Sequence, residues 1–263
     1  MKEYLKEELR RVFTSFNTKI SSILCFLCLL IGGFDMLRLD PEIIDFADTF
    51  TYAQTSGTSA FISLAFPILC CLPYSHSYVT EYKTGFINYL LSKMKKNQYI
   101  KIKLIITGFM GGTVIAVPTL LFFFICLIRK GTQLTSDSGN IIIFFKSIYF
   151  SNPVLYILIL ILNSFLCGTI FAILGLGIST WIQNKYAAIF LPFCFYIFSG
   201  IVLGSVNRNL NAITLFCVNQ YNKVNEINIF IYDLILLIIG VGLFYTGVHK
   251  DERKTKEKNK KSF

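Results

Sequence analysis

The chain has 263 residues, of which 54% are hydrophobic, 16% are aromatic and 15% are charged, and its mean hydropathy is +0.60. Soluble domains carry about 25% charged residues, so the composition excludes a soluble globular enzyme, and the 26 Phe and 14 Tyr exclude a disordered chain. The net charge of +10 does not form one basic patch, because Lys and Arg occupy the gaps between apolar stretches. We therefore expect no nucleic-acid partner.

The first 19 residues predict an amphipathic helix that lies in the membrane interface. The apolar residues that recur there at helical spacing are Leu5, Leu9, Val12, Phe13 and Phe16. Lys and Glu occupy the opposite face, and helices with this pattern lie in the headgroup region of a bilayer. The alternative is a helix packed on another part of the protein. The interfacial position is favoured because a membrane span follows directly.

Six apolar stretches are long enough to cross a hydrocarbon core of about 30 Å. They are residues 20–37, 56–76, 104–128, 153–180, 187–206 and 227–248. Backbone polar groups in lipid must be satisfied within the segment, which an isolated apolar stretch achieves as a helix. The sequence therefore predicts an all-α integral membrane protein with six transmembrane helices, forming a single transmembrane domain over residues 1–263.

The distribution of basic residues predicts the orientation of the chain. Of the 25 Lys and Arg, 19 flank the spans on one side and six on the other. Cytoplasmic loops carry the excess of Lys and Arg, so both termini are expected in the cytoplasm, including a basic tail over 249–263. The first span begins after an acidic and basic segment and lacks a cleavage site, so it is expected to be retained. We expect a multi-pass protein of the cell membrane, in contact with lipid.

Two features of the spans predict how their helices pack. The pairs Gly108 with Gly112 and Gly200 with Gly204 have the G-x-x-x-G spacing that permits close helix contact. The long fourth span is expected to tilt, to project from the membrane or to bend near Gly168 and Gly175. Between the fifth and sixth spans, the apolar run 212–218 is too short to cross the membrane, and it predicts either a re-entrant hairpin or a loop.

The loop between the second and third spans predicts a second surface helix, over residues 81–94. The apolar residues at helical spacing in it are Tyr82, Phe86, Tyr89, Leu90 and Met94. Such a helix would lie along the cytoplasmic surface with its lysines in water or near anionic lipid. It is either a topological spacer or a rigid charged surface on which a cytoplasmic partner docks.

This arrangement resembles the permease subunit of bacterial type-2 ABC exporters, the ABC-2 type transporter permease family. The shared features are an N-terminal interfacial (elbow) helix, six spans, cytoplasmic termini and a Glu-x-x-x-Gly turn in the first cytoplasmic loop, followed here by FINYLLSK. The resemblance implies that this turn starts a coupling helix that contacts a separate cytoplasmic ABC ATPase. The residues concerned are Glu81, Tyr82, Lys83, Thr84 and Gly85.

Physical reasons for these residue types stand beside the resemblance. A carboxylate such as that of Glu81 is favoured at a helix start and can pair with a basic residue of a partner. Gly85 permits a bend or a close approach of backbone. The alternative is an ordinary acidic residue at a helix start and a loop glycine.

The resemblance also implies a permease that works as a dimer, with a second copy or a related permease, above two ATPase subunits. The second and fifth spans would flank the substrate path. Its candidate residues are Phe61, Phe66, Phe193, Phe195 and Phe198. The apolar walls do not select among peptides, lipids, drugs and polysaccharides as cargo. Similarity to small bacterial systems favours antimicrobial peptide export or immunity.

The sequence contains no pattern for catalysis on this chain. It has no G-x-x-x-x-G-K-[ST] phosphate-binding loop, and its two histidines, His76 and His249, are far apart and lack the H-E-x-x-H spacing. We expect no catalytic residue, metal site or cofactor here, with ATP and Mg bound to the partner ATPase. Asp35 and Asp233 are expected near the water-accessible outer ends of their helices, which predicts no buried proton or ion site. The alternative function is a non-transporting scaffold or sensor that recruits a cytoplasmic partner.

Overall fold

The computed structural model describes residues 2–55, 61–133, 144–219 and 226–261, with side chains from Glu3 to Lys250 within these ranges. All regular secondary structure in them is helical. The longer helices are α1 (Lys2–Thr14), α2 (Phe16–Arg38), α3 (Phe46–Thr55), α4 (Phe61–Cys71), α7 (Lys96–Lys130), α9 (Pro153–Trp181), α10 (Lys185–Phe198) and α13 (Glu226–Lys261). The shorter ones are α5 (Ser77–Lys83), α6 (Phe86–Lys93), α8 (Lys146–Ser151), α11 (Gly204–Val206) and α12 (Ile213–Phe216).

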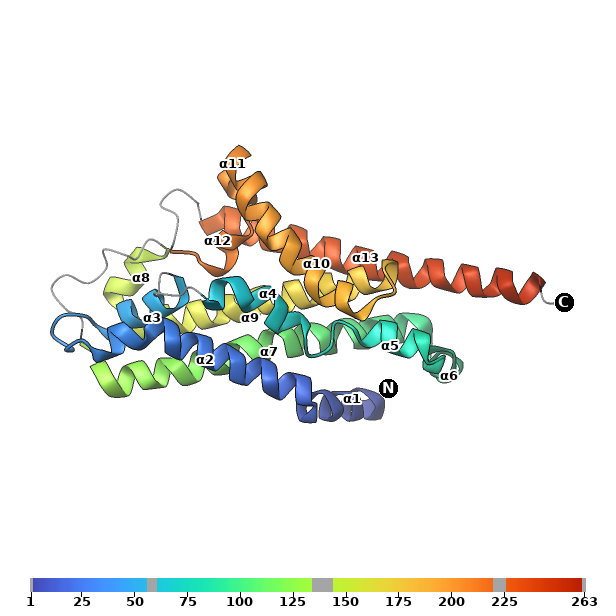
Figure 1. Ribbon diagram of the computed structural model, residues 1–263, viewed down its shortest axis with the longest axis horizontal. Helices are drawn as coiled ribbons and strands as arrows, with labels where there is room; N and C mark the ends of the chain where they lie inside the picture. Colours follow the sequence, from blue (N-terminus) through green and yellow to red (C-terminus); the bar gives the residue numbers. More distant parts are fainter. Residues whose placement is uncertain (1, 56–60, 134–143, 220–225, 262–263) are drawn as a thin grey trace.

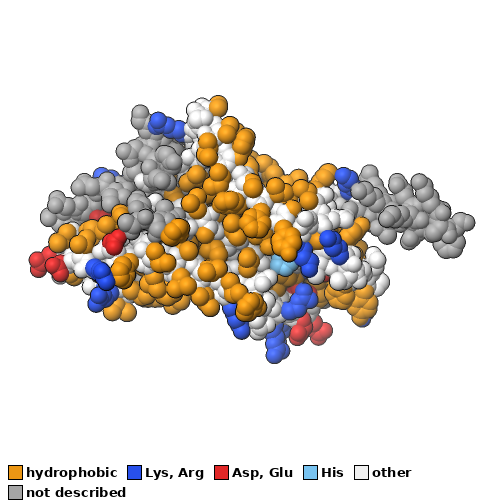
Figure 2. All heavy atoms as spheres, viewed as in Figure 1, with side chains coloured by type: hydrophobic (Ala, Val, Ile, Leu, Met, Phe, Trp, Pro, Cys, Tyr) orange, Lys and Arg blue, Asp and Glu red, His pale blue; other side chains and the backbone are white. Residues whose placement is uncertain are grey.

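Five helical segments are long and apolar enough to cross a membrane. They are Phe16–Arg38, Lys96–Lys130, Pro153–Trp181, Lys185–Val206 and Glu226–Lys250, the fourth of which continues from α10 through a π-helical turn into α11. Figure 2 shows hydrophobic side chains over the middle of the molecule and charged side chains gathered towards its two ends. A belt of this kind suits the hydrocarbon core of a bilayer. The chain is therefore an all-α, multi-pass membrane protein.

The second predicted span is not a single helix in the described residues. Residues 56–60, at its start, lie outside those residues, and α4 covers 11 residues, about 16 Å of helix. The outer loop expected before it contains α3, whose side chains are almost all buried. Figure 1 shows α3, α4 and α5 following one another along the long axis of the molecule.

Asp45 explains why α3 begins where it does, although its sequence is too polar to be recognised as a membrane segment. The Asp48 amide donates to Asp45 Oδ1 at 2.7 Å, and the Tyr149 hydroxyl donates to Asp45 Oδ2 at 2.9 Å. The first contact caps the free N–H groups at the helix start. The second attaches α3 to α8, so α3 is held by hydrogen bonds rather than by hydrophobicity alone.

Helix α9 lies at the centre of the bundle and packs against α4, α7, α10 and α13. It runs without interruption, and its glycines serve close packing. A Cβ atom on Gly168 would lie 2.6 Å from the backbone oxygen of Gly111 on α7. The expected close contact at Gly108 and Gly112 is confirmed, because a Cβ atom on either would collide with side chains of α9.

The apolar run 212–218 turns back into the bundle as the short helix α12. The ring of Phe216 stacks on that of Phe66 with centroids 4.5 Å apart, and the Asn163 side chain donates to the Leu215 carbonyl oxygen at 2.7 Å. A Cβ atom on Gly200 would lie 2.2 Å from Ile213, so this glycine also permits a close contact. The run is thus part of the core.

Helix α1 packs on the protein as well as presenting apolar groups at the surface. Val12 is buried against Ile102 and Ile106 of α7, whereas Phe13 and Phe16 are exposed. The break before α2 is capped by Ser15, whose hydroxyl accepts from the Thr18 amide. The packed alternative for this helix is therefore observed for one part of its surface.

The single helix expected over residues 81–94 is two helices, α5 and α6, because the chain turns at Gly85. This residue has φ of 72°, a left-handed conformation that favours glycine. A Cβ atom placed there would meet nothing within 4 Å. Of the two roles expected for Gly85, the structure has the bend, and the requirement for glycine comes from the backbone angle rather than from close packing.

Both ends of the described chain lie at the same end of the molecule. Figure 1 shows the N-terminal helix, the α5 and α6 pair and the C-terminal part of α13 there. The basic tail predicted over 249–263 continues α13 as helix to Lys261. Its side chains beyond Lys250 lie outside the described residues.

Replacing single glycines with alanine should give opposite effects at two positions. Gly168→Ala should lower the unfolding temperature in detergent, because its Cβ meets only backbone atoms of α7 that cannot rotate away. Gly242→Ala is the matched control, since nothing lies within 4 Å of its Cβ, and helix propensity alone favours Ala by about 0.5–1 kcal/mol. A Gly168→Ala variant as stable as Gly242→Ala would contradict the packing described for α7 and α9.

Candidate functional site

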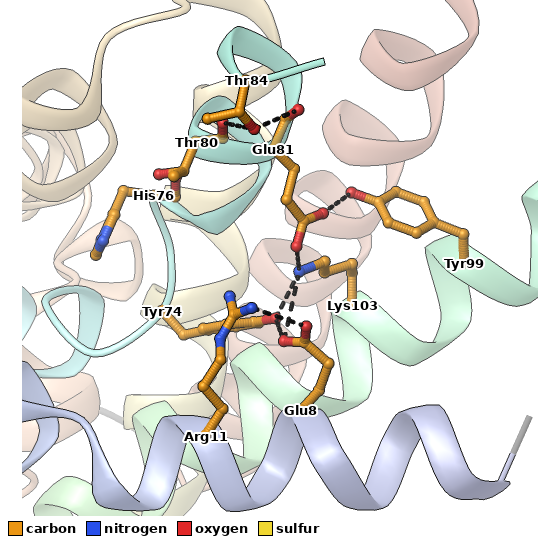
Figure 3. Close-up of polar contacts among 9 residues, drawn as sticks. All are labelled: Glu8, Arg11, Tyr74, His76, Thr80, Glu81, Thr84, Tyr99 and Lys103. Atoms are coloured by element: carbon orange, nitrogen blue, oxygen red, sulfur yellow. Dashed lines mark hydrogen bonds and ion pairs between the residues drawn. The ribbon is translucent and has the colours of Figure 1, made fainter. Parts of the chain in front are cut away.

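A buried polar cluster joins four segments near the end of the molecule that carries both termini. We call it the Lys103 cluster, and its members are Glu8 of α1, Tyr74 of the turn after α4, Glu81 of α5, and Tyr99 and Lys103 of α7. Each of these side chains is at least 95% buried, and that of Lys103 is fully buried. Figure 3 shows them pointing toward one another from their separate elements.

Lys103 lies at the centre of the cluster. Its ammonium group donates to Glu81 Oε1 at 2.5 Å and to the Tyr74 hydroxyl at 2.5 Å. The Glu8 carboxylate lies 3.9 Å from the same nitrogen and accepts a hydrogen bond from Tyr74. A buried ammonium ion is tolerated only when it is paired and hydrogen-bonded, and both conditions are met here.

The second oxygen of Glu81 is also occupied within the chain. The Tyr99 hydroxyl donates to Glu81 Oε2 at 2.7 Å. At the rim of the cluster, Arg11 lies 3.3 Å from Glu8 and is largely exposed. The two acidic side chains are thus matched by two basic ones, so the formal charges of the cluster and its rim cancel.

Tyr4 of α1 lies beside the cluster as a neutral phenol. Its burial raises the pKa of the hydroxyl group above the usual value, and the carboxylates of Glu81 and Glu8 raise it further. Ionising Tyr4 would add a third negative charge near two carboxylates, which explains the direction of the change.

The position of Glu81 differs from the one expected for a residue that contacts a partner. Only 4% of its surface is exposed, and both oxygens are bound within the chain. Glu81 was expected at a helix start, but helix α5 begins at Ser77 and Glu81 is its fifth residue. The next helix starts only after the turn at Gly85. Its carboxylate holds α5 on α7 instead of facing outward.

The other residues of the Glu-x-x-x-Gly turn are closer to the surface. Lys83, Thr84 and Gly85 are exposed, and Tyr82 is half-buried. Beyond them, α6 presents Phe86 and Tyr89, which are 40% and 52% exposed and stack with ring centroids 5.8 Å apart. We call this aromatic pair, together with Lys83 and Lys93, the α6 face.

The inner side of α5 and α6 is packed on the bundle. A cluster of apolar side chains connects the two helices to the ends of α7, α9 and α13. Its buried members are Tyr78, Ile87, Leu90, Tyr99, Ile100, Leu176, Phe244 and Val248. The α6 face is therefore fixed to three long helices by apolar packing and to α1 and α7 by the Lys103 cluster.

The five aromatic residues predicted for a substrate path are not all at the surface. Phe66 is fully buried among Phe171, Phe216 and Tyr196. The others are graded in exposure: Phe61 and Phe198 are 53% and 52% exposed, while Phe193 and Phe195 are half-buried.

The two carboxylates of the spans also differ from one another. Asp35 is exposed, as expected, whereas only 6% of Asp233 is exposed. The expectation that Asp233 is water-accessible is wrong, because its side chain faces the bundle.

Within the described part of the chain, no group of three or more His, Cys, Asp or Glu residues could hold a metal ion. Figure 3 shows His76 pointing away from the Lys103 cluster.

Sequence reasoning missed Glu8, Tyr74, Tyr99 and Lys103. One signal was available in α1, because Glu8 falls between Leu5 and Val12 on the apolar stripe rather than on the charged face. Tyr99 and Lys103 are likewise four residues apart on one face of α7. No spacing in the sequence indicates that Glu81 meets them.

Removing the central charge should destabilise the protein strongly. Lys103→Met leaves two buried carboxylates without their cation, a change that costs about 3–5 kcal/mol in buried ion pairs. Lys101→Met is the matched control, because Lys101 is exposed on the same helix. Thermal unfolding in detergent measures both variants. The double variant Lys103→Met with Glu81→Gln should recover part of the loss, since it removes one orphaned charge. Equal stability of Lys103→Met and Lys101→Met would show that the cluster does not hold these helices.

Comparison of the chain with known protein families, with characterised proteins and with solved structures gives no match. The role of the Lys103 cluster therefore rests on its geometry. That geometry is a connection, made of hydrogen bonds, ion pairs and apolar packing, between an exposed aromatic and basic surface and the helices of a membrane bundle.

Proposed function

We propose that this chain is the transmembrane permease subunit of an ATP-driven ABC exporter, coupled to a separate cytoplasmic ATPase. The observation that carries the proposal is the attachment of α5 and α6 to the bundle. A surface on which a motor acts must transmit its movement, and transmission requires a stiff element with few alternative positions. The Lys103 cluster and the apolar packing beneath α6 supply such an element.

In this proposal the α6 face contacts the ATPase. Two stacked aromatic rings flanked by lysines suit a partner cleft with apolar walls and acidic residues at its rim. Of the five residues in the predicted coupling turn, Tyr82, Lys83, Thr84 and Gly85 would approach the partner. Glu81 acts from behind them, by fixing α5 to Lys103.

ATP and Mg would be bound by the partner chain, and this chain would have no catalytic residue. ATP-driven closure of the two ATPase subunits pushes on the α6 face, and the cluster passes the displacement to α1 and α7. Tyr74 is part of the turn after α4 and is hydrogen-bonded to Lys103, so the same displacement reaches α4. The permease changes its access as these helices move relative to those of a second permease copy or a related permease.

The membrane topology in this proposal has six crossings. Helices α3 and α4 together make the second one, so both termini lie on the side of the α6 face. The excess of Lys and Arg on this side supports a cytoplasmic position for it, in a protein of the cell membrane. The exposed rings of Phe61 and Phe198, with the half-buried Phe193 and Phe195, line the path toward the second permease. Phe66 supports them from the core. Peptide, lipid or drug is the proposed class of cargo.

Removing the two exposed rings should weaken assembly with the ATPase. The double variant Phe86→Ala with Tyr89→Ala deletes the stacked pair without touching a buried side chain, and we expect its affinity for the ATPase to fall at least tenfold. The measurement is co-purification from cells that express the chain with a candidate ABC ATPase, which is sought as an adjacent open reading frame with a Walker A motif. Phe150→Ala is the matched control, because Phe150 is 56% exposed on α8. If the wild type, the double variant and Phe150→Ala all recover the same amount of ATPase, the α6 face is not the contact surface.

Loosening the cluster without removing the α6 face should separate binding from coupling. Glu81→Gln retains a similar shape but removes one charge opposite Lys103, so the complex should form while stimulation of ATP hydrolysis by the permease falls several-fold. Reconstituted vesicles measure both quantities.

The alternative function, a scaffold or sensor, predicts a cytoplasmic partner that hydrolyses no nucleotide. Testing cells that lack the chain against antimicrobial peptides and drugs would identify the class of cargo.

A further inference from the structure

Asp233 is a buried carboxyl group that neither the fold nor the proposed function uses. It is the eighth residue of α13, about 10 Å from the start of that helix. Its side chain is 94% buried, and neither oxygen has a hydrogen-bond partner among the described residues. Carboxyl groups inside spans almost always pair with another group or mark a pathway. An unpaired one therefore requires an explanation.

The register of α13 on α9 shows what surrounds Asp233. The two helices run in the same direction: Gly240 contacts Ile173 and Leu174, and Gly247 contacts Thr180. Asp233 lies about two helical turns before Gly240 on α13, and Leu166 and Cys167 lie about two turns before Ile173 and Leu174 on α9. The same register therefore places Asp233 beside Leu166 and Cys167. The electrostatic interaction between Asp233 and Cys167 agrees with this position.

The groups around Asp233 do not neutralise a negative charge. The titratable group that faces it from α9 is the Cys167 thiol, which donates to the Leu215 carbonyl oxygen at 3.2 Å. From the chain after α12, the Cys217 thiol donates to the Ser63 hydroxyl at 3.2 Å, and on α13 itself the neighbouring Tyr232 lies by Ser199, which follows α10. Within the described residues, no Lys or Arg forms an ion pair with Asp233. The side-chain oxygen of Asn163, one turn from Cys167, is also unpaired.

We propose that Asp233 is an intramembrane proton-binding site, which carries its proton as a neutral carboxylic acid in the packed interface of α9 and α13. Burying an isolated carboxylate costs far more than burying the acid, so a group without a partner takes up a proton instead. Unlike a metal cation, a proton can be held on the carboxyl group without a cavity between the helices. A movement that admits water between α9 and α13 would release it, so the packing of these helices is linked to proton binding. This inference is independent of any ATPase.

Infrared spectroscopy tests the proposal without knowledge of the cargo. The full chain is prepared in lipid vesicles at neutral pH with aspartate labelled by carbon-13 at the side-chain carboxyl. The wild-type protein should show the isotope-shifted carbonyl band of a protonated carboxyl group. Asp233→Asn should abolish this band, and Asp35→Asn should leave it unchanged, because Asp35 is exposed.

A second variant keeps the test decisive if Asp233→Asn does not fold. Asp233→Glu retains the acid, so the isotope-shifted band should be lost and an unshifted protonated band should replace it. A wild-type spectrum without a protonated aspartate band would overturn the proposal. So would an ionised Asp233 whose carboxylate band responds to sodium, because the site would then hold a metal cation rather than a proton.

Discussion

The arrangement of the cytoplasmic end proposed here depends on one constraint, the burial of the Lys103 ammonium group away from water. An isolated buried cation is too costly to persist, so the surrounding segments must supply oxygens to it. Glu8, Tyr74 and Glu81 do so from three different parts of the chain, and Tyr99 orients Glu81. The requirement to satisfy one charge therefore determines how α1, the turn after α4, and α5 are placed on α7.

This constraint gives the end of the bundle a property that apolar packing alone does not provide. Apolar contacts are non-directional and tolerate sliding, whereas a hydrogen-bonded ion pair has a defined geometry. Separating α1 or α5 from Lys103 takes a carboxylate away from the buried ammonium group, and separating the turn after α4 takes away a hydrogen-bonded hydroxyl. The α6 face is attached to this end, so a force applied to it is expected to move the four segments together. The mechanical role proposed for the chain follows from that coupling.

Sequence reasoning succeeded where hydrophobicity or backbone conformation decides the structure. Five of the spans and the bend at Gly85 were predictable, because long apolar runs form helices in lipid and a left-handed residue favours glycine. It failed where polar contacts between distant residues decide. Helix α3 is too polar to be recognised as a buried element and is held by Asp45. Glu81 was expected at the surface, because its partner Lys103 is 22 residues away, directly before the third predicted span.

Asp233 illustrates the same difficulty from the other direction. Its distance from the helix end suggested access to water, but exposure depends on which face of α13 packs on α9. That face follows from the contacts of Gly240 and Gly247, which no spacing in a single sequence specifies. The rotation of a membrane helix is set by its neighbours. Burial of polar residues in this bundle is therefore a tertiary property.

Hydrogen exchange read by mass spectrometry tests the central claim most directly, because it reports each helix separately. If Lys103 holds the segments as one unit, Lys103→Met should increase amide exchange in α1, α5 and α6 together, with Lys101→Met unchanged from the wild type. Loss of protection confined to α7, with α1 and α5 as protected as before, would contradict the account.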